Sequence, residues 1–253
     1  MGRGPHAMDA TLFAASAVGE LRSACADLSW LLGRGYAEAS ALALVGDRHR
    51  LQKRQRVAVS RSACGDADRA TRVQRRHELT ALRGASLAID GFNCIITVEA
   101  GLSGGVLLRG RDGALRDLAS VHGSYRRVET TAEALRRSVA AIERFEPARV
   151  LWWLDRPVSN SGRLASMIED ATAGARRDTE WAVQLDFDPD SRLREHDGII
   201  ASSDRAVLDG CRAWVDLPTA ALGPTLQPDG TPDAEPPPAL WCVDFRDEPD
   251  PAA

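Results

Sequence analysis

The chain has 253 residues, of which 44% are hydrophobic, so it can bury a sizeable core as one large domain or two small ones. Its formal net charge of −4 is unevenly distributed: residues 1–83 carry 14 basic and 8 acidic side chains, whereas residues 84–253 carry 18 basic and 28 acidic ones. No apolar run reaches the roughly 20 residues that a membrane-spanning helix needs, so we expect no membrane insertion.

The first residues do not resemble a secretory signal peptide, because Asp9 and Glu20 interrupt the apolar stretch that follows Arg3. Five cysteines are widely spaced along the chain: Cys25, Cys64, Cys94, Cys211 and Cys242. They include neither a Cys-x-x-Cys pair nor a histidine at zinc-ligand spacing. We therefore expect buried thiols in a reducing compartment and a cytoplasmic protein.

Residues 11–80 are predicted to form a small helical domain. Apolar residues recur at helical spacing from Thr11 to Leu32, and the glycines that follow end this helix. A second helix is expected from about Ala37 to Val45, and a third over residues 51–64.

This domain is strongly basic, with ten basic and three acidic side chains in residues 46–76. Two helices joined by a short turn are compatible with a helix-turn-helix motif, although a solvated helical hairpin can also carry arginines on its outside. Clustered basic side chains favour contact with a phosphate backbone of any sequence. The residues expected to contact nucleic acid are Arg48, Arg50, Lys53, Arg54 and Arg56.

Residues 84–218 show the pattern of an α/β domain. Short apolar runs predict strands at residues 87–89, 150–154, 181–185, 198–202 and 213–215. Helical stretches lie among them at residues 115–122, 132–145, 163–173 and 205–211. This alternation predicts a parallel, Rossmann-like sheet with helices on both faces.

Two segments do not fit this alternation. Residues 101–113 are rich in glycine and indicate a loop or small hairpin. Residues 221–253 contain eight prolines and mostly acidic charges, so we expect a disordered tail, although Trp241 and Phe245 could dock on the rest of the protein.

Aspartates follow the predicted strands repeatedly. Asp90 follows the first strand, Asp155 the second and Asp204 the fourth, while Asp197 precedes the fourth strand and Asp209 lies about one helical turn beyond Asp204. Ligands of doubly wound sheets bind outside the carboxyl ends of the strands. We therefore expect these side chains to share one acidic site.

Clustered carboxylates repel one another, and the natural compensation is a divalent cation with oxygen ligands, here Mg²⁺ or Mn²⁺. Such a site can activate water and stabilise phosphoryl transfer. The alternative for any single aspartate, including Asp186 and Asp188 after the third strand, is that it caps the following helix. The repetition at three strand ends favours the shared site.

Polar and basic residues near two of these acids suit a phosphate group. The Asn93 amide can donate and accept hydrogen bonds, and a helix N-terminus after Asp155 would attract an anion unless its serines and asparagine only cap the helix. The candidate phosphate contacts are Asn93, Arg156, Ser159, Asn160, Ser161 and Arg163.

These motifs resemble known families. Asp90-Gly-Phe-Asn93 after a strand, Asp155 after another, and Asp197-Gly-Ile-Ile-Ala-Ser-Ser-Asp204 together resemble the PIN-like and NYN ribonuclease superfamily, whose strand-end acids hold Mg²⁺ or Mn²⁺. Over residues 20–216 the chain is also similar to an uncharacterised prokaryotic family that joins a small helical domain to a PIN-like domain. Leu28-Ser-Trp-Leu-Leu32 and Ser120-Val-His-Gly123 are among the segments that carry this second resemblance.

The superfamily resemblance implies that Asp90, Asp155 and Asp204 act in catalysis and bind the metal, that Asp197 or Asp209 adds a fourth acid, and that Asn93 supports the site. It also implies an acid on a helix in the middle of the fold, for which the candidates are Glu99, Asp112 and Asp117. The expected function is a metal-dependent phosphodiesterase acting on RNA. A catalytically inactive nucleic-acid-binding or regulatory protein is the alternative, and a phosphatase or phosphotransferase for a small molecule is a third possibility.

Overall fold

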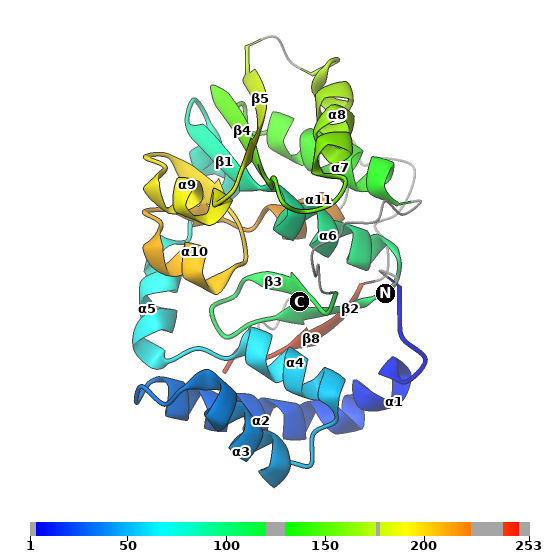
Figure 1. The fold of residues 1–253 in the computed structure, drawn as a ribbon, viewed down its shortest axis with the longest axis vertical. Coiled ribbons are helices and arrows are strands. Elements are labelled where there is room, and N and C mark those ends of the chain that lie inside the picture. The colour runs from blue at the N-terminus through cyan, green and yellow to red at the C-terminus, as the bar shows by residue number, and fades with distance from the viewer. Residues whose placement is uncertain (1–3, 120–129, 176–177, 224–239, 248–253) are drawn as a thin grey trace.

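The structure, a computed structural model, describes residues 4–119, 130–175, 178–223 and 240–247 (Figure 1). Within these ranges the chain forms an N-terminal helical region, a five-stranded parallel sheet flanked by helices, and a three-stranded sheet between the two (Figure 1). None of the described helices is both long and apolar enough to cross a membrane.

The large sheet confirms the five strands that the apolar runs predict. They are β1 (Ser86–Asp90), β4 (Arg149–Asp155), β5 (Glu180–Asp186), β6 (Ile199–Ala201) and β7 (Trp214–Val215), and all pair in parallel. Their order across the sheet is β5-β4-β1-β6-β7. The chain builds outward from β1 on one side and then returns to build outward on the other, so the boundary between β1 and β6 is a topological switch point.

Helices cover both faces of this sheet. One layer holds α6 (Gly91–Leu102), α7 (Thr131–Glu143), α8 (Ser161–Thr172) and α11 (Leu217–Leu222), and the other holds α9 (Pro189–Glu195) and α10 (Arg205–Gly210). Side chains alternate between the layers along β1: Leu87 and Ile89 join the first core, and Ala88 joins the second. Burial on both sides explains why these strands are continuous apolar runs.

Residues 106–117 form a hairpin. β2 (Val106–Arg109) and β3 (Leu115–Asp117) pair antiparallel across a turn in which Gly113 has φ +82°. The expected helix over residues 115–122 is therefore wrong at Leu115–Asp117, and residues 120–122 lie outside the described ranges. The physical reason is that the strand buries Leu115 and the nearby Leu118 in two different hydrophobic cores, which one face of a helix could not do.

The helical region consists of α1 (Asp9–Leu12), α2 (Ala15–Leu32), α3 (Glu38–Arg48), α4 (Lys53–Ser62), α5 (Asp66–Arg75) and the 3₁₀ turn η1 (Leu79–Leu82). The three helices predicted from periodicity correspond to α2, α3 and α4. The sequence pattern did not indicate α5, half of whose residues are charged.

Part of the proline-rich tail is ordered. β8 (Trp241–Asp244) pairs in parallel with β2, and Val243 and Phe245 are buried in a core shared with α2, α3 and α4. The expected disorder is thus wrong for residues 240–247, where a short apolar segment finds an open strand edge. Cys242 on this strand is exposed, unlike the other four cysteines, which are buried as expected.

Candidate functional site

A pocket of about 380 Å³ lies at the carboxyl ends of β1, β4 and β6, bordered by α4 and β3. Its position next to the β1–β6 switch point is where an open α/β sheet binds ligands. Charged side chains dominate its lining: Asp90, Asp117, Asp155, Asp190, Asp204, Arg61, Arg116 and Arg205. Three of the acids, Asp90, Asp155 and Asp204, are those predicted from the sequence.

Asp90 ends β1 and caps α6. Its Oδ1 accepts a hydrogen bond from the backbone N–H of Asn93 at 3.3 Å, and its Oδ2 accepts one from the Ser202 hydroxyl at 2.8 Å. Burial raises the pKa of Asp90 to about 7, helped by Asp190 and Asp204 and opposed by the two hydrogen bonds.

Gly91 explains how this acid comes so close to the neighbouring strand. A Cβ atom at this position would lie 2.6 Å from Leu154 Cδ2 and 2.9 Å from the Trp153 carbonyl oxygen. Only glycine therefore allows α6 to begin against β4.

Asp204 combines capping with a place in the pocket. Its Oδ1 accepts hydrogen bonds from the backbone N–H groups of Ala206 at 2.8 Å and Val207 at 3.3 Å, at the start of α10. The alternative reading of these aspartates as helix caps is thus correct for Asp90 and Asp204, and both also line the pocket.

Asn93 links the two strands at the switch point. Its Oδ1 accepts hydrogen bonds from the backbone N–H and the hydroxyl of Ser203, both at 2.9 Å. These bonds hold the start of α6 against the end of β6 and leave the Asn93 amide nitrogen beside the pocket, where the described residues offer it no hydrogen-bond acceptor.

Asp155 and Asp190 complete the acidic side. Burial raises the pKa of Asp155. A backbone hydrogen bond lowers this pKa in part, and repulsion from Asp188 raises it further. Burial also raises the pKa of Asp190, with further repulsion from Asp204 and Asp155. The carboxylates therefore act on one another electrostatically.

Sequence reasoning missed Asp190. The run Asp186-Phe-Asp-Pro-Asp190 follows the third strand, and only its first two acids were considered as candidates. In the structure Asp186 pairs with Arg192 and Asp188 caps α9, so both are occupied locally. The available signal was Pro189, which favours the first turn of a helix and so places Asp190 next to the strand end.

The arginines of the pocket are bound to other acids. Arg116 donates to both oxygens of Asp112 at 2.7 Å, and Arg205 pairs with Glu38 of α3. Arg61 lies beside Asp117. In the part of the chain that the structure describes, no arginine forms an ion pair with the remaining four acids, namely Asp90, Asp155, Asp190 and Asp204.

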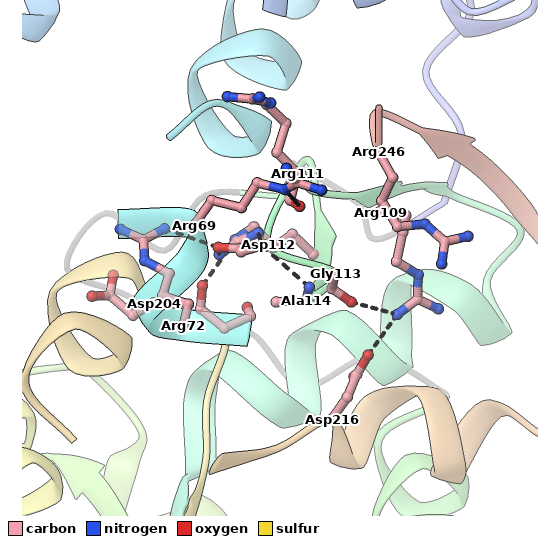
Figure 2. Close-up of polar contacts among 12 residues, drawn as sticks. Arg69, Arg72, Arg109, Arg111, Asp112, Gly113, Ala114, Asp204, Asp216 and Arg246 are labelled. Atoms are coloured by element: carbon pink, nitrogen blue, oxygen red, sulfur yellow. Dashed lines mark hydrogen bonds and ion pairs between the residues drawn. The ribbon is translucent and has the colours of Figure 1, made fainter. Parts of the chain in front are cut away.

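Asp112, which is not part of the pocket lining, holds the pocket residue Arg116 in place. Its buried carboxylate also binds Arg72 of α5 at 2.9 Å and the backbone N–H of Ala114 at 3.2 Å (Figure 2). Although burial opposes its charge, the two guanidinium groups hold its pKa well below the usual range. A second link at the same hairpin joins Arg109 to Asp216 before α11 (Figure 2).

Two predicted metal ligands do not reach the pocket. Asp197 precedes β6, so it lies at the opposite edge of the sheet, where it is 86% exposed and pairs with Arg212. Asp209 lies near the end of α10, where Arg72 binds both its oxygens at 2.7 and 2.9 Å. The structure therefore places neither Asp197 nor Asp209 at the pocket, whereas Asp190 lines it.

Of the three candidates for a mid-fold acid, only Asp117 lines the pocket. It comes from strand β3 and not from a helix, and the Thr97 hydroxyl donates to its Oδ2 at 2.9 Å. Glu99 is fully buried on α6 and accepts a hydrogen bond from Thr131. Asp112 is held between its arginines.

The expected phosphate contacts around the start of α8 lie outside the pocket. This applies to Arg156, Ser159, Asn160, Ser161 and Arg163. The Arg156 guanidinium lies over the Phe187 ring, 5.4 Å from its centroid, and Ser161 is buried. Asn93 is the one member of the predicted phosphate set that lines the pocket.

The predicted nucleic-acid contacts are largely paired with acids. Arg54 binds the buried Asp9 at 2.6 and 2.8 Å, Arg56 binds Asp47, and Arg48 lies 3.4 Å from Asp27. Arg50 and Lys53 are exposed near the start of α4. The pocket residue Arg61 lies eight positions after Lys53, about 12 Å along the helix.

Comparisons with known proteins place the chain among families of unknown function. The sequence pattern of a protein family of unknown function, DUF434, matches residues 20–75, which run from within α2 to the end of α5. An uncharacterised protein of Methanocaldococcus jannaschii is 26% identical over 198 residues, which are 78% of this chain and 93% of that protein. No solved structure matches the chain. The pattern of a domain of unknown function, DUF5616, matches residues 79–220, more than half of the chain, and the chain therefore belongs to the DUF5616 family.

Proposed function

We propose that the pocket is the active site of a metal-dependent phosphodiesterase of the PIN-like type that acts on RNA. The observation that carries the proposal is the convergence of Asp90, Asp155, Asp190 and Asp204 at the carboxyl ends of parallel strands. Among the described residues no arginine forms an ion pair with these acids, although the charge of Arg194 lowers the pKa of Asp190. The mutual repulsion of the acids therefore favours binding of a cation.

The donor set fits Mg²⁺ or Mn²⁺, because carboxylate oxygens are the ligands these hard cations prefer. Among the described residues no three His, Cys, Asp or Glu side chains are grouped closely enough to hold a metal by themselves. Mg²⁺ commonly uses one or two carboxylates and completes its shell with water and substrate phosphate oxygens. Asp90 and Asp204 would hold the ion in that way. When bound, it would lower the pKa of a water molecule and neutralise charge on the phosphoryl group.

The protein side chains would position the ion and the substrate. Without a cation the pKa of Asp90 is about 7, and a bound cation would favour the charged carboxylate that holds it. The Asn93 amide nitrogen can donate to a phosphate oxygen. Phe92 and Ile96 supply the apolar part of the lining, which limits water at one side of the pocket.

Two features support the PIN-like and RNA parts of the proposal. The parallel strand order with acids at its switch point agrees with the resemblance of Asp90-Gly-Phe-Asn93 to PIN-like sites. Arginines reach the same pocket from the helical region and from α10, as a phosphate-rich substrate would require. Acids and arginines together make nucleic acid the best match.

The test is cleavage of single-stranded and hairpin RNA by the purified chain with Mn²⁺ or Mg²⁺. Asp90→Asn and Asp190→Asn should each lower the rate by about 100-fold or more. Asp197→Asn is the matched control, because it removes an exposed carboxylate at the opposite edge of the sheet. Unchanged activity in Asp90→Asn would refute the proposal.

The alternatives have distinct outcomes in the same assay. RNA binding without cleavage, and without calorimetric uptake of Mn²⁺, would identify an inactive PIN-like binding protein. Hydrolysis of small phosphomonoesters with no cleavage of RNA would identify a phosphatase, a reading favoured by the ion pairing of Arg48, Arg54 and Arg56.

A further inference from the structure

We propose that Arg61 and Arg205 form an anion site inside the pocket, which holds a second phosphate group of the substrate beside the carboxylates. The inference rests on the proposed function for the nature of the neighbouring reaction centre, but the anion site can be tested without any reaction. Its consequence is that the helical region supplies part of the substrate site.

The two arginines reach the pocket from different parts of the chain. Arg61 lies on α4 of the helical region, and Arg205 is the first residue of α10, directly after Asp204. Both line the pocket, and their side chains are 32% and 30% exposed. They are therefore accessible to a ligand, yet supported by the protein.

Each guanidinium group is held along one edge only. Arg61 Nη1 donates to the backbone oxygen of Asp117 at 2.6 Å, and Arg205 Nη2 donates to both carboxylate oxygens of Glu38 at 2.8 Å. For Nε and Nη2 of Arg61, and for Nε and Nη1 of Arg205, the described residues offer no hydrogen-bond acceptor.

This arrangement suits a phosphate for two reasons. Arginine presents its donors as a planar fork that matches phosphate oxygens. The bonds to Asp117 and Glu38 already restrict the side chains, so less conformational entropy is lost when an anion binds. A ligand phosphate would complete the hydrogen bonding of both groups.

Apart from the pair Arg61–Asp117, the basic side chains of the pocket and its four remaining acids form no direct ion pairs among the described residues. Neither Arg61 nor Arg205 forms an ion pair with Asp90, Asp155, Asp190 or Asp204 in the described part of the chain. A ligand with phosphates at neighbouring positions can place one beside the arginines and one beside the acids. A nucleic acid strand has this chemistry, and an isolated phosphomonoester does not.

The experiment is calorimetric binding of adenosine 3′,5′-bisphosphate to the full chain, once with Mn²⁺ and once with EDTA. This probe carries two phosphates but no phosphodiester, so the proposed reaction cannot consume it. Arg61→Gln and Arg205→Gln should each weaken binding about tenfold or more under both conditions. Arg163→Gln changes an exposed residue of α8 outside the pocket and should bind as the wild type does.

A folding defect is separated from a binding defect by Arg61→Lys and Arg205→Lys. Each keeps the positive charge and can keep its bond to Asp117 or Glu38, but loses the fork, so its affinity should fall while its melting temperature stays that of the wild type. Affinities within about twofold of the wild type in both glutamine variants, or an equal loss in Arg163→Gln, would overturn the anion site.

The same variants separate this inference from the proposed function. Arginine-dependent binding in a protein that cleaves no RNA would support the anion site and refute the phosphodiesterase. Metal-dependent cleavage that requires Asp90, with binding insensitive to both arginines, would support the phosphodiesterase and refute the anion site.

Discussion

Asp90 and Asp204 show how one carboxylate can serve both the fold and a site. Each stands where a parallel strand ends and a helix begins, so a capping oxygen and a ligand oxygen are needed within the same few ångströms. Asp204 caps α10 through Oδ1 alone and has no described partner for Oδ2. Asp90 uses both oxygens and is buried, so its charge is costly in the folded state.

Asp90→Asn should make the protein more stable at about pH 8, by roughly 1–3 kcal/mol in the free energy of unfolding. A pKa raised to about 7 means that the folded state binds more protons than the unfolded state between about pH 4 and pH 7, so its stability falls as the pH rises through that window. Asparagine removes the buried charge and its cost. Urea unfolding measures the change, and Asp197→Asn should shift stability by less than about 0.5 kcal/mol.

The gain in Asp90→Asn should disappear near about pH 4, where Asp90 is neutral in the folded wild type as well. A variant less stable than the wild type at both pH values would show that the hydrogen bond from Ser202 outweighs the buried charge.

His49 predicts a pH effect of the opposite sign. Its side chain is 8% exposed and lies 2.6 Å from Glu20 and 2.9 Å from Asp27. Burial alone would lower its pKa, but the hydrogen bonds and charges of Asp27 and Glu20 raise it above 6.5. Its stabilisation is therefore complete below the unfolded pKa and is lost as the pH rises through the raised one. His49→Gln should cost stability in melts at about pH 5.5, and the difference from the wild type should narrow steadily at higher pH.

At the scale of secondary-structure elements, the sequence predicts the parallel sheet well because its strands are buried on both faces and so appear as apolar runs. It predicts β3 wrongly because Leu115 and Leu118 have helical spacing, and only the distant partner β2 decides between strand and helix. The sequence does not indicate β8 for a related reason, because its partner strand β2 lies more than 130 residues earlier. In the candidate site, the predicted strand ends identify Asp90, Asp155 and Asp204. The position of Arg61 in the pocket depends on the packing of α4 against β2, which no local sequence pattern shows.

The packing of α5 against the β2–β3 hairpin depends on Asp112, which lies in the turn between β2 and β3. Its carboxylate is 1% exposed and neutralises Arg72 and Arg116, whose side chains are 3% and 6% exposed. Asp112→Asn would leave the buried Arg116 without its carboxylate partner and Arg72 with Asp209 alone, so we expect a loss of about 3–5 kcal/mol in urea unfolding. Asp47→Asn, which breaks the exposed pair with Arg56, should cost less than about 1 kcal/mol. Equal effects of the two substitutions would contradict this role.

At the scale of the whole molecule, the small sheet joins the helical region to the α/β part. Leu107 of β2 belongs to the core of the large sheet, while Val106 and Leu108 belong to the core of the helical region. The pairs Arg205–Glu38 and Arg72–Asp209 connect the same two parts. The pocket lies at this junction, so its shape depends on both parts being folded.

We therefore expect the two parts to unfold in a single transition, and Phe245→Ala tests this. Phe245 is 2% exposed in the core of the helical region, and its truncation should cost about 3–5 kcal/mol. Hydrogen exchange in increasing urea, followed at the amides of α2 and of β4, should show both midpoints falling together, because opening either core exposes β2. Val73→Ala on the exposed face of α5 should move neither midpoint appreciably. If the α2 midpoint fell while the β4 midpoint kept its wild-type value, the helical region would be an independent unit, and the pocket could open without unfolding of the sheet that carries its carboxylates.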